Sequence, residues 1–517
     1  MGSPPDSHSR QFLAATLIAA LLSLHAVAAA EPAITPAPAA AAQPAQRADW
    51  LLGGQLEQWR LPTDESVGVA RLALRRRIGS FLAVGVDSYA AVRGSRGGFI
   101  TLGVGGEALI PLRGRTSLAA GLSLTAGGGR GGYQLSGGGL MAREQLGLRF
   151  TLPGAGALEI GASRVDFPNG GQIHSTQLYL GYSRSFSSRY AVDAADDGSG
   201  RWSGPALAAS DRSSQQLSVF VQRLSGAGAQ HGFGLVGAEW RSDLGSGAYG
   251  RLEAAGAASG GSSGYMQILG GLGYRHALLP RLAATVAASA GAGGGGGVDT
   301  GGGLLLEASI GVELRLTARD LVELSGTALK APSASFSAHG LALRAEHRFG
   351  AEPDAAKAGG GEGALEPHHV RVRFADQQYY ARTRDWTSRP NREFGNLGVQ
   401  VDYFVNPAVY LSGQGLAAYA GRNGAYMIGL VGAGYHQRLG RRCYAELELL
   451  AGAAGGGGVE VGSGLVGQAN AGLGCRGAAG FGVLASAGRL QARRGAFAAN
   501  VLGLSVTYQT TLLTFAD

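Results

Sequence analysis

The sequence predicts an all-β protein whose long antiparallel strands form a transmembrane β-barrel. Glycine supplies 90 of the 517 residues, well above its usual share of about 7%. Charged residues make up only 15%, and no segment after the N-terminal region has the roughly 18 consecutive apolar residues of a spanning helix. Apolar residues alternate with small or charged ones, which is the period of a β-strand.

Residues 1–30 have the layout of a secretory signal peptide. His8 and Arg10 precede an apolar run over residues 12–24, and small residues occupy positions 28–30. We therefore expect cleavage after Ala30, followed by a flexible Ala/Pro-rich leader over residues 31–47.

Three motifs recur in the same order about 160 residues apart. The first opens on an aromatic residue that is followed six positions later by glycine: Phe99, Tyr265 and Tyr426. The second is rich in glycine and covers residues 124–140, 288–304 and 450–465. The third places Leu-x-Leu five residues after Ile173, Phe336 and Phe497. This order predicts three homologous repeats.

Two segments without alternation separate the repeats. Residues 191–213 and 350–367 are small, acidic and rich in Pro and Gly, as linkers often are. The repeats are therefore expected over residues 48–190, 214–349 and 368–517.

The first repeat divides into eight strands of period two. In residues 99–112, for example, Ile100, Leu102 and Val104 share one face, and Thr101 and Gly103 lie on the other. The strands are expected near residues 51–61, 67–78, 81–92, 98–112, 117–126, 138–152, 157–166 and 173–186. Strands this long favour a bilayer-spanning barrel over a secreted β-sandwich, whose strands average five or six residues.

Tight and longer connections alternate along this repeat. The tight ones lie at residues 78–80, 113–115 and 153–156, and the longer ones include the glycine-rich stretch 127–137. Outer-membrane barrels keep their short turns in the periplasm, which would place both linkers there.

The chain resembles outer-membrane β-barrel proteins of Gram-negative bacteria as a class. Last strands in that class close on phenylalanine, as the segments ending at Phe186, Phe349 and Phe515 do here, although two residues follow Phe515. The resemblance implies an outer-membrane location, contact with outer-membrane lipid and insertion by the barrel-assembly machinery.

Three units of eight strands allow two architectures. We favour a single barrel of about 24 strands, because an open strand edge in lipid is untenable. Three tandem eight-stranded barrels remain the alternative, and the phenylalanine-closed segments inside the chain favour it. An eight-stranded barrel is just filled by its own side chains.

Charged residues on the polar faces of the strands are the first candidate site. In a wide pore they would select ions or solutes, whereas in a filled barrel they would pair with one another. They are Glu107, Arg143, Arg149, Glu307, Glu313, Arg315, Arg344, Glu346, Arg348, Glu446 and Glu448.

The glycine runs at residues 127–132, 293–297 and 455–458 contain no nucleotide-binding signature. A structural role is the simpler interpretation, since glycine lets backbones turn sharply and approach closely. In a single barrel they could also narrow one mouth, and deletion of residues 293–297 would then raise conductance.

Cys443 and Cys475 lie on the strands that flank the third glycine-rich segment. The register that pairs Leu447 with Ala471 also pairs the two cysteines on one face, close enough for a disulfide. We predict a disulfide that acts as a structural staple.

Other functions have weaker signals. Arginines are scattered rather than gathered in a basic tract, so nucleic acid is not an expected partner despite the net charge of +8. His174, Ser175 and His339 could suggest a lipid hydrolase, but GxSxG and HExxH are absent. His368 and His369 have no second ligand pair at useful spacing, so neither a metal nor a cofactor is expected.

The most favoured function is therefore a passive channel or translocation pore that carries an exported or imported solute. The runner-up is a non-conducting structural or surface-interaction protein made of small filled barrels. An outer-membrane lipid hydrolase comes third, and we expect the protein not to be an enzyme.

Overall fold

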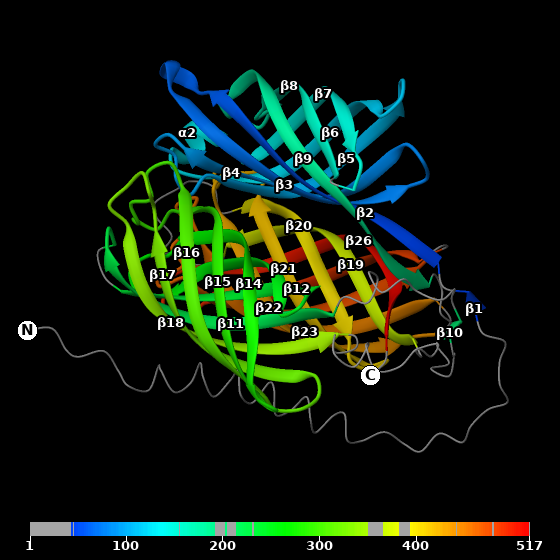
Figure 1. Ribbon diagram of the computed structural model, residues 1–517. Helices are drawn as coiled ribbons and strands as arrows, with labels where there is room; N and C mark the ends of the chain where they lie inside the picture. The colour runs from blue at the N-terminus through cyan, green and yellow to red at the C-terminus, as the bar shows by residue number, and fades with distance from the viewer. Residues whose placement is uncertain are drawn as a thin grey trace, which may run out of the picture.

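The computed structural model describes residues 43–44, 46–154, 156–191, 202–203, 214–229, 232–349, 365–381, 393–440, 442–477 and 480–515 (Figure 1). The predicted signal peptide, most of the leader and most of both linkers lie outside the described residues. The described chain is nearly all β-strand, as expected. None of its helices has the length and apolar character needed to cross a membrane.

Eight antiparallel strands form the first ring, here called ring 1. Its last strand pairs with its first, because Gln46–Glu57 lies beside Tyr179–Tyr190. The strands are β2 (Gln46–Arg60), β3 (Ser66–Ile78), β4 (Leu82–Arg93), β5 (Ile100–Pro111), β6 (Thr116–Gly128), β7 (Leu140–Leu152), β8 (Gly156–Asp166) and β9 (His174–Ala191). Two short helices, η1 (Pro62–Asp64) and α2 (Gly132–Ser136), lie in its connections.

Ring 2 is a closed barrel of the next eight strands. Its closing pair joins Gln215–Ala227 to Ser337–Phe349. The strands are β11 (Gln215–Ala227), β12 (Phe233–Gly245), β13 (Ala248–Ser259), β14 (Met266–Leu279), β15 (Leu282–Gly294), β16 (Leu304–Arg315), β17 (Asp320–Lys330) and β18 (Ser337–Phe349).

Ring 3 closes in the same way, with Leu365–Ala381 beside Ala499–Phe515. Its strands are β19 (Leu365–Ala381), β20 (Glu393–Phe404), β21 (Val409–Ala418), β22 (Met427–Arg438), β23 (Cys443–Gly455), β24 (Leu465–Arg476), β25 (Phe481–Ala492) and β26 (Ala498–Phe515). The remaining strands, β1 (Gln43–Pro44) and β10 (Trp202–Ser203), form a separate parallel pair.

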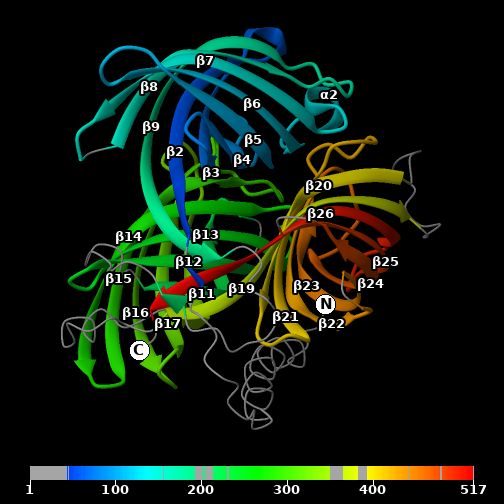
Figure 2. The same cartoon turned by 90° about the vertical axis from the view of Figure 1, so that its right-hand side faces the viewer.

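The favoured single barrel of about 24 strands is wrong. In each ring the first and last strands pair with each other. The described strands therefore leave no long unpaired edge for pairing with another ring. Closing a ring within one unit also brings together strands that are nearer in sequence, which costs less chain entropy. Within the part of the chain that the structure describes, the rings share strand pairing only at the ends of β9 and β26, where Arg189–Ala191 lies beside Thr511–Leu513. Figures 1 and 2 show the three rings lying side by side.

The eight strands expected in the first repeat correspond to β2–β9, and most of their ends agree within two or three residues. The largest differences are at the outer ends, where β2 begins at Gln46 and β9 runs to Ala191. Helix α2 was not expected, since residues 127–137 were interpreted as a loop.

The side-chain distribution is inverted relative to a soluble protein. The outward positions are apolar and exposed, as at Leu178 (75%), Ile310 (67%) and Leu449 (70%), one from each ring. The inward positions carry buried charges, such as Arg143, Arg344 and Arg371. The strand period of two assigns these two sets to opposite faces.

The two ends of the rings differ. We call the end with residues 94–99, 129–139, 295–303 and 456–464 the glycine rim. We call the opposite end, with the tight turns at residues 79–81, 112–115 and 280–281 and with residues 439–440 and 442, the turn rim.

Candidate functional site

The interior of ring 1 is filled by paired charges. Arg75 donates to Asp87 at 2.8 Å and to Glu107 at 3.0 Å. Arg143 pairs with Glu57 at 2.9 Å, and both side chains are fully buried. These contacts involve five of the eight strands of the ring, so the charges act as cross-links rather than as the lining of an open channel.

Ring 2 has a denser network. Arg251 pairs with Glu253 at 2.7 Å and with Glu239 at 2.5 Å. Arg344 reaches Glu323 at 3.2 Å and Glu239 at 3.4 Å. Glu239 is therefore shared by Arg251 and Arg344, and it also pairs with Arg241. The attraction of these guanidinium groups offsets part of the desolvation cost of burying the carboxylate.

Ring 3 uses two arginines on a single strand. Arg371 pairs with Asp402 at 2.7 Å and with Glu446 at 2.8 Å. Arg373 lies two positions along β19, so it also faces inward, and pairs with Asp402, Glu446 and Glu448. Bidentate guanidinium groups can bridge several carboxylates at fixed geometry.

The structure places ten of the eleven expected lumen charges in ring interiors with little exposure. Arg315 is the exception: it is half-buried at the last position of β16. Several further interior charges, which the same alternation marks, were not among the expected ones. They are Glu57, Arg71, Arg75, Asp87, Glu159, Glu239, Arg241, Arg251, Glu253, Glu323, Arg371, Arg373 and Asp402.

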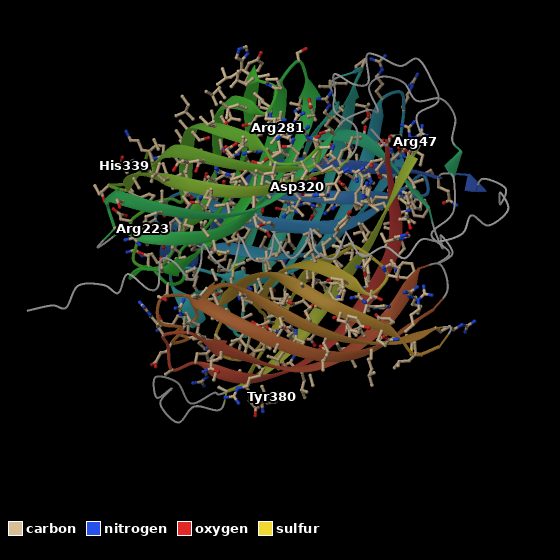
Figure 3. All side chains as sticks on the ribbon, turned by 90° about the horizontal axis from the view of Figure 1, so that it is seen from below. Arg47, Arg223, Arg281, Asp320, His339 and Tyr380 are labelled. Carbon is tan, nitrogen blue, oxygen red and sulfur yellow. A yellow bond between two sulfur atoms is a disulfide. The ribbon has the colours of Figure 1, made fainter. Side chains whose placement is uncertain are left out.

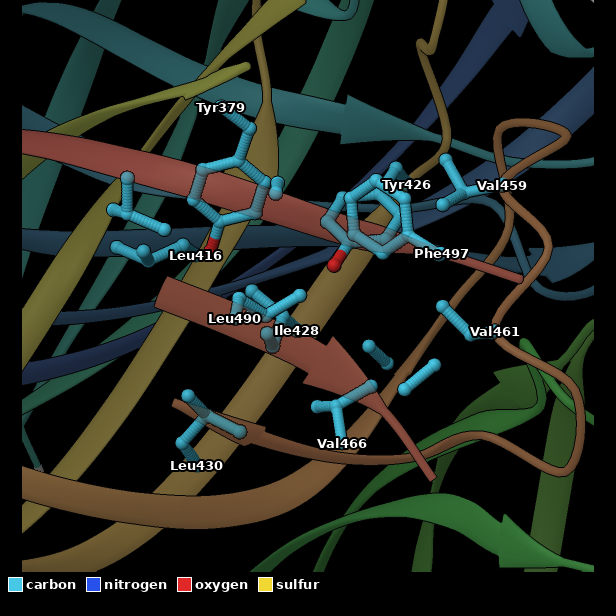
Figure 4. Close-up of a cluster of buried hydrophobic side chains, with 14 of the residues drawn as sticks. Tyr379, Leu416, Tyr426, Ile428, Leu430, Val459, Val461, Val466, Leu490 and Phe497 are labelled. Carbon is cyan, nitrogen blue, oxygen red and sulfur yellow. The ribbon is translucent and has the colours of Figure 1, made fainter. Parts of the chain in front are cut away.

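An apolar plug closes each ring on the glycine-rim side of its charges. In ring 3, Tyr426 and Phe497 (Figure 4) have ring centroids 6.2 Å apart. Both also pack with Phe394. Tyr265 and Phe336 make the corresponding contact in ring 2, at 6.1 Å.

The aromatic positions of the first sequence motif all belong to these plugs, and they are at most 3% exposed. Inward faces are therefore not polar throughout. In β3, Val67 and Val69 face the plug, and Arg71 and Arg75 on the same face reach the charged layer.

Small cavities lie between the interior charges of rings 1 and 3. A cavity in ring 1 beside Arg71, Glu107 and Glu159 measures about 20 Å³. Another in ring 3, beside Arg373 and Glu448, measures about 10 Å³. Each volume is about that of one or two water molecules.

One group of carboxylates could hold a metal ion by distance alone. Glu313, Glu323 and Glu346 in ring 2 have ligand oxygens within 4.8 Å of one another. Arg241 lies 3.0 Å from both Glu323 and Glu346, and Arg275 pairs with Glu313 at 2.6 Å. Arginine therefore already neutralises the group, and the donor set does not indicate a metal.

The glycine runs lie where the rings meet rather than around a shared mouth. In each case, the residue directly before the aromatic residue of the first sequence motif approaches the glycine run of another ring. These contacts join, in cyclic order, Gly98 with Gly295, Gly264 with Gly456, and Ala425 with Gly128. A Cβ atom at Gly98 would lie only 2.5 Å from the nitrogen of Gly295. The expected narrowing of a pore depended on a single barrel and does not apply.

A second set of glycines repeats the same cyclic order. Gly139, Gly303 and Gly464 have φ angles of +99°, +95° and +94°. A Cβ on any of them would lie 2.0–2.4 Å from a carbonyl oxygen of the neighbouring ring, at Ala418, Ala91 and Ala257 respectively. Only glycine fits both the backbone angle and the close approach.

Apolar side chains from all three rings fill the junction. The buried cluster consists of Ala90, Ile100, Ala126, Ala292, Ala417 and Met427. Ring 1 contributes the first three, ring 2 the fourth and ring 3 the last two. The rings therefore share one apolar contact region near the glycine rim.

Two carboxylates in the connections of the glycine rim are held by hydrogen bonds. Donation from Arg96 and Ser95 lowers the pKa of Glu65 below its usual value. Donation from Ser335 lowers the pKa of Asp299 in the same way. Both groups are charged at neutral pH and hold neighbouring connections together.

Cys443 and Cys475 form a disulfide between β23 and β24. The two residues are direct register partners, as are Leu447 and Ala471 on the same strands. The bond lies at the turn rim, at the opposite end of these strands from the glycine-rich connection.

The structure does not bring His174 and Ser175, on β9, together with His339, on β18. His174 pairs with Asp166 at 3.0 Å, whereas the Ser175 hydroxyl accepts a hydrogen bond from the Arg60 backbone at 2.9 Å. His339 is exposed on β18. His368 bonds to Tyr403 and Thr514, and His369 bonds to Thr511.

No protein-family model matches the chain, and no curated protein matches it. Among solved structures, OccAB4 of Acinetobacter baumannii is 11% identical with a TM-score of 0.23, over 90% of this chain and 98% of that one. The outer membrane protein OpdK of Pseudomonas aeruginosa is 11% identical with a TM-score of 0.22, over the same shares. The siderophore receptor PirA of Pseudomonas aeruginosa is 10% identical with a TM-score of 0.26, over 91% of this chain and 81% of that one. Similarity to solved structures at this level supports no conclusion about the substrate or the activity of this protein.

Proposed function

We propose that this chain is an outer-membrane protein of three small filled β-barrels, which serves as a non-conducting structural or surface-interaction unit. The observation that carries the proposal is the interior of each ring, where a layer of paired charges lies beneath an apolar plug. The runner-up among the functions expected from the sequence is thus the one that the geometry favours.

The outward faces support a membrane location. Large apolar side chains are exposed on strands of every ring, while the charges are turned inward. In water this arrangement would leave extensive apolar surface unburied, whereas lipid tails would cover it. In closed rings the strands pair with one another all the way round, so few backbone groups are left without hydrogen bonds. A bilayer requires this, because its apolar core offers backbone groups no other partner.

The interior argues against solute passage in this conformation. A solute crossing ring 1 would have to separate pairs such as Arg143 with Glu57 and then displace the plug around Phe99. Breaking one buried ion pair by removing a partner typically costs about 3–5 kcal/mol. Several pairs in series make a high barrier.

The proposal includes three homologous repeats, each forming one ring. It is supported by the shared roles of the motif residues: Phe99, Tyr265 and Tyr426 belong to the plugs of successive rings. It is also supported by the cyclic order of the glycine contacts. Export through a cleaved signal peptide remains part of the proposal, with the turn rim in the periplasm.

Planar-bilayer recording of the refolded protein tests the function. Insertion is first verified by heat-modifiable mobility on a gel, and a general porin serves as the conducting control. We expect inserted protein to give no open-channel steps, because each ring is filled. Steady nanosiemens-size steps from inserted protein would contradict the proposal and return the passive channel to first place.

A further inference from the structure

The turn rim carries exposed arginines on all three rings. Arg113 and Arg115 lie in the connection after β5, and Arg281 lies between β14 and β15. Arg438 ends β22, and Arg442 immediately precedes β23. These five exposed residues are called the arginine collar.

Exposed aromatic side chains gather towards the same rim. Eight of the exposed large aromatics lie on the half of the strands nearer the turns: Phe81, Phe150, Tyr182, Phe186, Trp240, Tyr274, Tyr435 and Phe481. Tyr380 lies near the glycine rim. Aromatic belts mark the level where lipid tails meet headgroups.

The arginine collar begins where the apolar outer surface ends. Leu112, Leu279 and Leu439 are 56%, 63% and 56% exposed, and each lies one or two residues from a collar arginine. The aliphatic parts of those arginines can follow the apolar surface while the guanidinium groups reach the headgroup layer.

Few carboxylates compete for the collar. Asp49, Asp243 and Asp320 are the acids at this rim whose described side chains are not buried. Asp49 already pairs with Arg47 at 3.1 Å, and Asp320 with His347 at 2.8 Å. The rim therefore presents a surplus of positive charge at the membrane interface.

We infer that the arginine collar binds the phosphate groups of anionic glycerophospholipids. Guanidinium groups bind phosphate oxygens in pairs of hydrogen bonds, and they retain their charge at every accessible pH. The inference rests on the proposed membrane location. Because the short turns are assigned to the periplasmic side, the partner is a phospholipid of that leaflet, such as phosphatidylglycerol.

Tryptophan quenching by brominated lipids tests the inference, because Trp240 is exposed on the outer face of ring 2, in the half of β12 nearer the turn rim. The protein is reconstituted in vesicles of phosphatidylcholine and phosphatidylglycerol, with either one or the other lipid brominated. We expect brominated phosphatidylglycerol to quench more strongly than brominated phosphatidylcholine at equal mole fraction. When all five collar arginines are replaced by glutamine, the preference for phosphatidylglycerol should fall by at least about fivefold. This is the effect expected from one arginine near an anionic surface.

The matched control replaces five exposed basic residues near the glycine rim: Arg60→Gln, Arg130→Gln, Arg223→Gln, Lys330→Gln and Arg494→Gln. Figure 3 shows Arg223 and Arg47, a residue of the turn rim, towards opposite ends of the molecule. The control should keep the lipid preference. If the five-residue collar variant does not fold, Arg281→Gln alone, in the same ring as Trp240, should still reduce it.

Three outcomes would overturn the inference: equal quenching by the two lipids in the unmodified protein, an unchanged preference in the collar variants, or an equal loss in the control. Displacement of phosphatidylglycerol from the collar by purified lipopolysaccharide would also overturn it, since the rim would then suit the outer leaflet. The absence of quenching by either lipid would instead contradict the membrane location itself.

Discussion

Single glycines decide how closely the rings approach one another. At Gly139, Gly303 and Gly464, a carbonyl oxygen of the next ring occupies the place that a Cβ would need. The sequence showed that the glycine-rich segments recur, but it could not show what they approach. That information depends on the neighbouring ring, which lies more than a hundred residues away in the chain.

Gly464→Ala is therefore predicted to destabilise the contact between rings 3 and 2. The added Cβ would lie 2.0 Å from the Ala257 carbonyl oxygen, so backbone must move. Gly297→Ala is the matched control, because Gly297 also has a positive φ of +74° but no atom lies within 4 Å of its Cβ position. In urea unfolding, we expect Gly464→Ala to cost about 2 kcal/mol more than the control. Equal costs would mean that backbone strain alone matters.

Buried charges inside the rings make a second prediction at this scale. Arg143→Met leaves the Glu57 carboxylate buried without its main partner and should cost about 3–5 kcal/mol of unfolding free energy. Adding Glu57→Gln removes the unpaired charge while keeping an oxygen for the Trp59 indole NH. The double variant should recover most of the loss. A double variant as unstable as Arg143→Met would show that the ion pair is not the source of the effect.

Individual strands were the most predictable level of structure. The period of two, with long apolar faces, placed all eight strands of the first repeat, because that pattern is a local property of the chain. Prediction was weaker where a face changes character along one strand. On β19, Arg371 and Arg373 face the charged layer, and Tyr379, on the same inward face, belongs to the apolar plug. The layering inside a ring is set by neighbouring strands, so alternation alone does not reveal it.

The disulfide between β23 and β24 is predicted to stabilise ring 3. Replacing both cysteines by serine removes a constraint on the unfolded chain over a sequence separation of 32 residues. The expected cost is about 2–4 kcal/mol in urea unfolding, and reductant should have no further effect on the variant. An unfolding midpoint that is identical for oxidised protein, reduced protein and variant would contradict the staple role.

At the scale of the whole molecule, strand number was predictable and ring closure was not. Eight strands per unit fit one large barrel or three small ones equally well, since both leave no open edge in lipid. The deciding information is the partner of each terminal strand. Here β2, β11 and β19 pair with β9, β18 and β26, and each pairing stays within one unit. Closure in turn determines whether the charges line a pore or fill a core.

Cysteine cross-linking of the closing strands of ring 2 tests this account most directly. Val219 on β11 and Ala345 on β18 are register partners, and both are half-buried. In a chain with Cys443→Ser and Cys475→Ser, the pair Val219→Cys and Ala345→Cys should form an intramolecular disulfide that shifts mobility on a non-reducing gel. A second variant carries Ala345→Cys together with Val370→Cys on β19. If the first pair forms no disulfide in folded protein and the second pair does, β18 lies beside β19 and the account of three filled barrels is contradicted.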